Sequence, residues 1–108
     1  MTARRPVFRY VIVKVADADA NLLESKLAAA VMRLGGVLGL ARVEPAVVYV
    51  RADKGLAVVR VKREGLLLFR AALAAYKEPL ARVVKVAGTL RKARAICSSL
   101  PGASAELR

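Results

Sequence analysis

The segment that most restricts the fold of this chain is an apolar run near its amino terminus, Val7–Val15, which reads VFRYVIVKV. Its residues are mostly β-branched or aromatic, the types that fit a pleated sheet, so we predict a central strand. Ala46–Arg51 and Leu56–Lys62 have the same character. The four residues between them form a turn in which Gly55 is free to take a positive φ, so we expect a hairpin.

Apolar periodicity predicts a helix on either side of this hairpin. Asn21 lies three residues before Glu24, as in a capping box, and the helix that follows is expected to stop at Gly35-Gly36. The second helix is predicted from Glu64 up to residues 78–79. The apolar faces comprise Leu23, Leu27, Ala30, Val31 and Leu34 in the first helix and Leu67, Phe69, Leu73 and Tyr76 in the second.

The last part of the chain contains a strand and a short helix. The strand is expected over Ala81–Ala87, where Val84 and Val86 alternate with Lys85, and Thr89 is placed to cap the helix. The apolar side of this helix comprises Leu90, Ala93, Cys97 and Leu100. We expect it to end at residues 101–102, followed by a flexible tail over residues 101–108.

The predicted order is strand, helix, strand, strand, helix, strand, which is that of the ferredoxin-like fold of RNA-recognition domains. We therefore predict an α+β sandwich of βαββαβ type. Two helices should cover one face of a four-stranded antiparallel sheet, and a short C-terminal helix follows. A chain of 108 residues suits one domain, with its core over about residues 7–100.

An excess of basic residues restricts the function. Lys and Arg total 20 against 8 Asp and Glu, a formal charge of +12 at pH 7. This charge favours a polyanionic partner, most often nucleic acid; an anionic membrane surface and an inert thermophile surface are the alternatives. The longest uncharged stretch of the structured part, Leu34–Ala41, has eight residues against about 20 for a membrane helix. We therefore expect a cytoplasmic protein, and the lack of Gln with a single Asn suits a thermophile.

Residues that could carry catalysis are scarce. One cysteine, Cys97, and no histidine exclude an internal disulfide, a Cys-based zinc site and His-dependent chemistry. We expect no catalytic residue and no cofactor bound by the protein. An acylphosphatase-like enzyme of this fold would need an arginine near the first strand and an asparagine that positions water. Arg9 is present, but Asn21 lies at a predicted helix cap.

Side chains alternate along a strand, so the two faces of the predicted sheet differ. The face toward the helices comprises Val11, Val13, Val59, Val61, Val84 and Val86. The open face comprises Phe8, Tyr10, Ile12, Lys14, Leu56, Val58, Arg60, Lys62, Val83 and Lys85. The third strand lacks the aromatics that stack bases in a standard RNA-recognition motif. We therefore place RNA on the cationic rim and a protein partner on the apolar part, ahead of base stacking.

Three basic clusters, at residues 4–5, 60–63 and 91–94, could together line one side of the molecule. The RNA-binding candidates are Arg4, Arg5, Arg9, Tyr10, Lys14, Arg60, Lys62, Arg63, Lys85, Arg91, Lys92 and Arg94. Leu22, Ala29 and Met32 lie off the main stripe of the first helix, which indicates either an interface or a closely packed alanine-rich helix. The partner-interface candidates are Phe8, Ile12, Leu22, Met32, Leu56 and Val58.

Four segments carry a resemblance to a known family. They are RYVIVKV at Arg9–Val15, GLAVVRVKRE at Gly55–Glu64, FRAAL at Phe69–Leu73 and VAGTLRKAR at Val86–Arg94. Their order and spacing resemble ribonuclease P protein component 2 of archaea and its eukaryotic relatives. Relative to typical members, the connection from Gly35 to Glu44 and the tail after Leu100 look abbreviated.

This resemblance implies a ferredoxin-like fold, pairing with the barrel protein ribonuclease P protein component 3, and support of a catalytic RNA. It also allows a homodimer within a heterotetramer. The RNA, with magnesium ions, would cleave precursor tRNA at the 5′ end, so this chain would meet precursor tRNA only indirectly. The basic residues in the matching segments, and so the expected phosphate contacts, are Arg60, Lys62, Arg63, Arg91 and Lys92. A small-ligand-binding regulatory or assembly module of the same fold is the alternative, although it leaves the charge unexplained.

Overall fold

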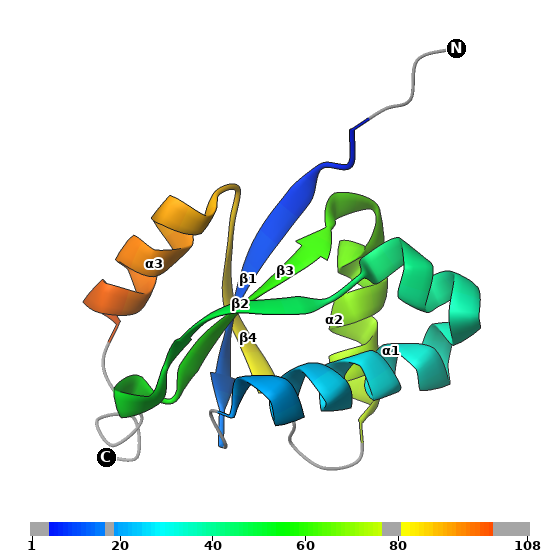
Figure 1. The fold of residues 1–108 in the computed structure, drawn as a ribbon, viewed down its shortest axis with the longest axis horizontal. Helices are drawn as coiled ribbons and strands as arrows, with labels where there is room; N and C mark the ends of the chain where they lie inside the picture. The colour runs from blue at the N-terminus through cyan, green and yellow to red at the C-terminus, as the bar shows by residue number, and fades with distance from the viewer. Residues whose placement is uncertain (1–4, 17–18, 77–80, 101–108) are drawn as a thin grey trace.

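The computed structural model describes residues 5–16, 19–76 and 81–100. In chain order the elements are β1 (Phe8–Val15), α1 (Ala20–Val43), β2 (Ala46–Arg51), η1 (Ala52–Lys54), β3 (Leu56–Lys62), η2 (Arg63–Gly65), α2 (Leu66–Ala75), β4 (Ala81–Ala87) and α3 (Leu90–Ser99) (Figure 1). The strands form an antiparallel sheet in the order β2-β3-β1-β4. The predicted α+β, ferredoxin-like fold is confirmed. The predictions for Arg4, for residues 77–80 and for the tail at 101–108 lie outside the described residues.

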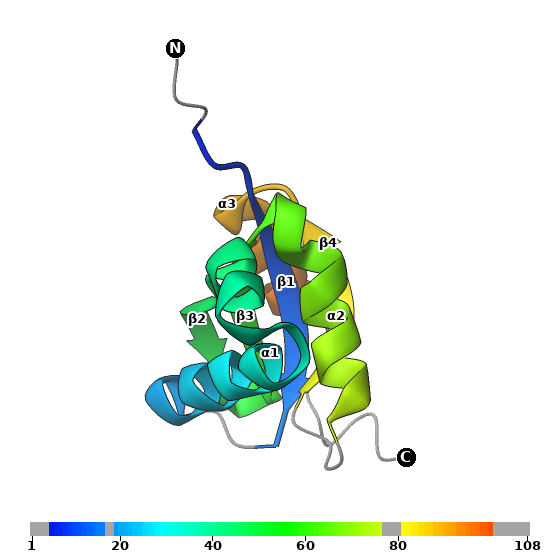
Figure 2. The same ribbon diagram turned by 90° about the vertical axis from the view of Figure 1, so that its right-hand side faces the viewer.

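α1 and α2 lie on one face of the sheet and α3 lies on the other (Figure 1, Figure 2). The side chains that close the core beneath α1 and α2 are fully buried. They include Val11, Val13, Leu27, Val59, Val61 and Phe69. The prediction that the valines of β1 and β3 face the two helices is therefore confirmed.

The opposite sheet face was expected to be open, and this is wrong for its apolar part. Ile12, Leu56 and Val58 are 0–2% exposed and form a second core with Ala87, Ala93 and Cys97. The predicted apolar side of the last helix packs on these residues. Its two central members, Ala93 and Cys97, are small, so the helix lies close to the sheet. Ile12, Leu56 and Val58 thus contact α3, and in this structure they are not available to a partner.

A β-bulge in β4 overturns the predicted facing of two valines. Ile12 pairs with Lys85 while Val13 pairs with Val83, so Val84 is an extra residue opposite β1. Val84 is 36% exposed, whereas Val83 and Val86 pack against the core beneath α1 and α2. The expectation that Val84 faces the core and Val83 the open face is therefore wrong.

β2 contains a second bulge. Val47 pairs with Val59 and Tyr49 with Val58, so Val48 is the extra residue. Strict alternation would place Val47 and Tyr49 on one face. The bulge instead turns Tyr49 to the α3 side, where it packs against the second core.

The start of α1 differs from the predicted capping box. Asp19 is the N-cap, and its Oδ1 accepts hydrogen bonds from the backbone N–H groups of Asn21 (3.0 Å) and Leu22 (3.2 Å). Glu24 Oε1 accepts one from the backbone N–H of Val47 at 2.7 Å. Glu24 therefore ties α1 to β2 rather than capping the helix, because Asp19, two residues before the predicted cap Asn21, already satisfies the first helical N–H groups.

α1 bends at Gly36 instead of ending there. Gly36 has φ 67° and ψ −164°, a conformation open to glycine, and helical geometry then resumes up to Val43. The connection that looked abbreviated is thus largely helical. The bend leaves Leu34, Val37 and Leu38 48%, 69% and 80% exposed, so the predicted burial of Leu34 is wrong.

α2 begins at Leu66, after the turn η2, and not at Glu64. Phe69 is fully buried as predicted, but Leu67 is 82% exposed. Gly65 is buried against the end of α1, so the backbones of η2 and α1 approach each other closely at this point.

The turn between β2 and β3 fixes the C-terminal end of α3. Lys54 Nζ donates to the carbonyl oxygens of Cys97 (3.1 Å), Ser98 (2.6 Å) and Leu100 (2.9 Å). The last carbonyls of a helix lack helical partners and carry partial negative charge, so an ammonium group there stabilises the helix. At the other end, Thr89 Oγ1 accepts a hydrogen bond from the Lys92 N–H at 3.2 Å, which confirms Thr89 as the cap.

Replacing Gly65 by alanine is expected to destabilise the fold. A Cβ at this position would lie 2.5 Å from the Arg42 carbonyl oxygen and 2.7 Å from the Val43 Cα, and neither backbone atom can move aside cheaply. We expect Gly65→Ala to lower the free energy of unfolding by about 2 kcal/mol, measured by urea denaturation. Gly88→Ala is the control, because nothing lies within 4 Å of a Cβ there. Equal stability of the two variants would contradict the close approach.

Lys54→Met is expected to loosen α3. Cys97 lies on the buried side of this helix, where burial raises the pKa of its thiol, so it should react with a thiol reagent only when α3 opens. Loss of the Lys54 hydrogen bonds should cost about 1 kcal/mol or more, which raises the reaction rate of Cys97 about fivefold. The measurement is the rate at which a disulfide reagent modifies Cys97. Lys26→Met, at an exposed position of α1, is the control. An unchanged rate in Lys54→Met would show that Lys54 does not hold α3 in place.

Candidate nucleic-acid interface

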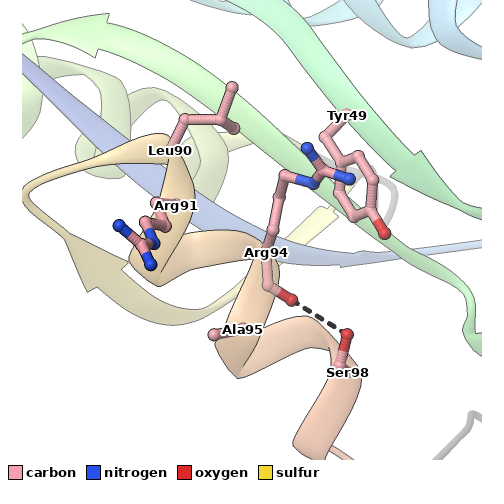
Figure 3. Close-up of a pocket in the computed structure, with 6 residues that line it drawn as sticks. All are labelled: Tyr49, Leu90, Arg91, Arg94, Ala95 and Ser98. Carbon is pink, nitrogen blue, oxygen red and sulfur yellow. Dashed lines mark hydrogen bonds between the residues drawn. The ribbon is translucent and has the colours of Figure 1, made fainter.

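A groove between α3 and β2 brings an aromatic ring and two arginines together. Its volume is about 480 Å³, and its lining comprises Tyr49, Leu90, Arg91, Arg94, Ala95 and Ser98 (Figure 3). The α3 residues follow one another at helical spacing, one position round the helix from the buried side formed by Ala93 and Cys97. α3 therefore uses one side to cover the sheet and the next to line the groove.

Arg94 and Tyr49 are in contact across this groove. The guanidinium carbon of Arg94 lies 5.0 Å from the centroid of the Tyr49 ring, within the range of a cation–π interaction. Figure 3 shows the guanidinium lying over the ring, and the Ser98 hydroxyl donating to the Arg94 carbonyl oxygen at 3.2 Å. The pair presents a planar cation supported by an aromatic ring, an arrangement that can stack on another planar group.

Arg51 adds a third guanidinium at the end of the groove that lies beside the C-terminal end of α3. Its Nε and Nη2 donate to the two carboxylate oxygens of Asp53 at 3.0 and 2.9 Å, and its Nη1 lies 3.5 Å from Ser98 Oγ. The hydrogen bonds from Arg51 lower the pKa of the Asp53 carboxyl. The pKa of Arg51 is raised, mainly by its hydrogen bonds to Asp53 and secondly by its interaction with Tyr49. Because the pair is exposed, it orients Arg51 more than it stabilises the fold.

A second aromatic–arginine pair lies at the start of β1. The Arg60 guanidinium carbon is 4.5 Å from the centroid of the Phe8 ring, and both residues are partly buried. Arg60 Nε is buried and makes no hydrogen bond within the part of the chain that the structure describes. Phe8 thus holds Arg60 on the sheet, and this ring is not free on that side to stack a base.

Lys62 has a structural role in the free chain. Its Nζ lies 3.1 Å from Glu44 Oε2 and donates to the Ala41 carbonyl oxygen at 3.1 Å, so it ties the end of β3 to the end of α1. Its neighbour Arg63 is exposed and shares a hollow of about 340 Å³ with Arg5, Lys62 and Glu64. The structure therefore brings two of the predicted basic clusters, near residues 5 and 60–63, to one place.

The remaining RNA-binding candidates are dispersed over the surface. Arg91, Lys92 and Arg94 are exposed on α3, and Lys85 is exposed on β4. Arg9 donates to the Phe8 carbonyl oxygen at 3.1 Å. Tyr10 packs against the core beneath α3, and Lys14 is partly buried on β1. The basic candidates thus gather at the α3 side of the groove and at the hollow beside Arg5 and Arg63.

The partner-interface candidates on α1 lie at the surface. Leu22 and Met32 are each 42% exposed. Leu34, Val37 and Leu38 are exposed on α1 as well, so within the described residues α1 carries most of the large exposed apolar side chains; the others are Val7, Leu67 on α2 and Val84 on β4. Close by, a shallow groove of about 670 Å³ runs between α1 and β2 and includes Val37, Leu40, Glu24 and Glu44.

Tyr49 and Ser98 are site residues that the sequence analysis missed. The spacing of Arg91, Arg94 and Ser98 on one helix side was visible in the sequence and could have identified the α3 side of the groove. Tyr49 could not have been placed, because the bulge that turns it toward α3 has no clear sequence signal.

In residues 5–16, 19–76 and 81–100 no cluster of three or more Cys, Asp or Glu side chains is placed to hold a metal ion. None of the helices that the structure describes has the length and apolar character needed to cross a membrane.

Comparison with known proteins shows the family of this chain. The family model described as the Rpp14/Pop5 family matches residues 9–98, which include every strand and helix of the structure apart from the first residue of β1 and the last of α3. No curated protein matches the chain. The match covers most of the sequence, and the chain belongs to the Rpp14/Pop5 family, a family of ribonuclease P proteins.

Proposed function

We propose that this chain is a protein subunit of the ribonuclease P ribonucleoprotein that binds the catalytic RNA and supports removal of the 5′ leader from precursor tRNA. The observation that carries the proposal is the family match over residues 9–98. The formal charge of +12 supports it, because binding to a polyanion offsets the repulsion among so many cations. Closer assignment to ribonuclease P protein component 2, an archaeal thermophilic source and a cytoplasmic location remain predictions from the sequence.

The basic side of α3 supports RNA contact. Arg91, Lys92 and Arg94 are all exposed, and α3 contains no acidic residue to oppose a phosphate. Each phosphate that these side chains neutralise would release condensed counterions, so affinity should fall as salt rises. Arg63 and Arg5 at the hollow offer a second region of contact.

The exposed apolar side chains of α1 support a protein partner. Leu22, Met32, Val37 and Leu38 are more exposed than large apolar side chains usually are, and contiguous apolar surface commonly marks an interface. We propose this surface, and not the sheet face, for ribonuclease P protein component 3 or for a second copy of the chain. Magnesium would act on the RNA, which we expect to carry out the cleavage. A small-ligand-binding module is not favoured by the family match.

The test compares RNA binding by two variants of equal charge. One replaces Arg91, Lys92 and Arg94 by glutamine, and the control replaces Lys26, Arg33 and Arg70, which are exposed on α1 and α2. Both lose three positive charges. We expect the α3 variant to bind ribonuclease P RNA at least tenfold more weakly, with a salt slope shallower by about one unit for each phosphate that is no longer neutralised. The control should keep most of its affinity.

Binding is measured across a salt series against ribonuclease P RNA and an unrelated structured RNA of equal length. Precursor-tRNA cleavage is measured with the same preparations at low magnesium, with and without component 3. Preferential binding together with stimulated cleavage is the expected result. Equal, salt-sensitive binding to both RNAs with no stimulation would overturn the proposed function.

A further inference from the structure

We propose that the groove between β2 and α3 is a binding site for one unpaired nucleotide of an RNA strand, whose base extends the stack formed by Tyr49 and Arg94. The inference rests on the proposed function for the source of the RNA and adds the kind of RNA structure that this face recognises. It also departs from our sequence-based expectation, which ranked base stacking below phosphate contact.

The stack is already formed in the free chain. The guanidinium carbon of Arg94 lies 5.0 Å from the centroid of the Tyr49 ring, so one side of the guanidinium faces the ring. Nucleobases stack on aromatic rings and on arginine guanidinium planes alike. This contact in the free chain reduces the conformational entropy that Arg94 loses when RNA binds.

The groove also matches the other parts of a nucleotide. Leu90 and Ala95 supply apolar walls, Arg91 lies one helical turn before Arg94, and the Ser98 hydroxyl lies one turn after it (Figure 3). Arg91 lines the groove and can meet a phosphate beside the base, whereas Arg51, 3.5 Å from Ser98 Oγ, is paired with the Asp53 carboxylate at 2.9 Å. None of the six described lining residues is acidic.

Size and openness favour an unpaired nucleotide over a double helix. The volume of about 480 Å³ falls within the roughly 300–1,000 Å³ of pockets that hold small ligands. In an A-form helix the bases are stacked on one another, so none can reach Tyr49 or Arg94. A bulged, looped or terminal nucleotide has its base free to enter.

The experiment uses two RNA hairpins of identical stem, one blunt and one with a short single-stranded 3′ overhang of uridines. Affinity for the intact chain is measured by fluorescence anisotropy at moderate salt. We expect the overhang hairpin to bind roughly tenfold more tightly, because base stacking on an aromatic platform is of that order. Tyr49→Phe keeps the ring and should keep this preference, whereas Tyr49→Leu should lose it.

Two exposed positions test the groove without disturbing the core. Arg94→Gln removes the stacked cation, and Ala95→Glu places a carboxylate among the lining residues. The matched controls are Arg70→Gln and Ala74→Glu, exposed on α2 on the far side of the sheet. We expect both groove variants to abolish the preference for the overhang and both controls to retain it. Circular dichroism checks that every variant is folded.

The outcomes separate this inference from the proposed function. If the groove variants keep the overhang preference, or if the wild-type chain binds both hairpins equally while still preferring ribonuclease P RNA, the nucleotide site is wrong and the subunit function stands. If the chain binds neither hairpin nor ribonuclease P RNA, both fail. Binding of a decaglutamate peptide that depends on Arg94 and Ala95, with no overhang preference, would instead assign the groove to an acidic protein segment.

Discussion

The packing of α3 on the sheet is the interaction on which the rest of the surface depends. Ala93 and Cys97 are small enough to let the helix lie directly on Ile12 and Val58, and Lys54 holds its last carbonyl groups. Without this helix, the sheet would expose a row of large apolar side chains. With this helix in place, the same face presents the basic side of α3 beside the Tyr49 ring. The packing of Ala93 and Cys97 on the sheet therefore determines which ligands this face can bind.

The arrangement of elements was predictable because it depends on short-range patterns. The β-branched runs located β1 and β3, Gly55 located the hairpin turn, and Thr89 located the start of α3. These signals lie within a few residues of the feature that they predict. They are sufficient for the order of strands and helices, and from the order the antiparallel sheet follows.

The parts that were not predicted depend on contacts between distant segments. Val84 and Val48 are extra residues in their strands, and a bulge shifts the facing of every residue beyond it. Gly36 has the local signature of a helix end, although it bends a helix whose second half packs near Gly65. Tyr49 reaches its groove only through one of these bulges. The sequence therefore predicts the α3 residues of the candidate site but not Tyr49 on β2.

The three-layer arrangement has a thermodynamic consequence. The apolar surface of α1 and the groove of α3 lie on opposite sides of a sheet whose two cores are both closed. Ligands on the two sides would share no side chain, so neither would displace the other, and their binding free energies would add. A chain of this design can act as a rigid spacer, which fixes the distance and angle between what it holds on its two sides.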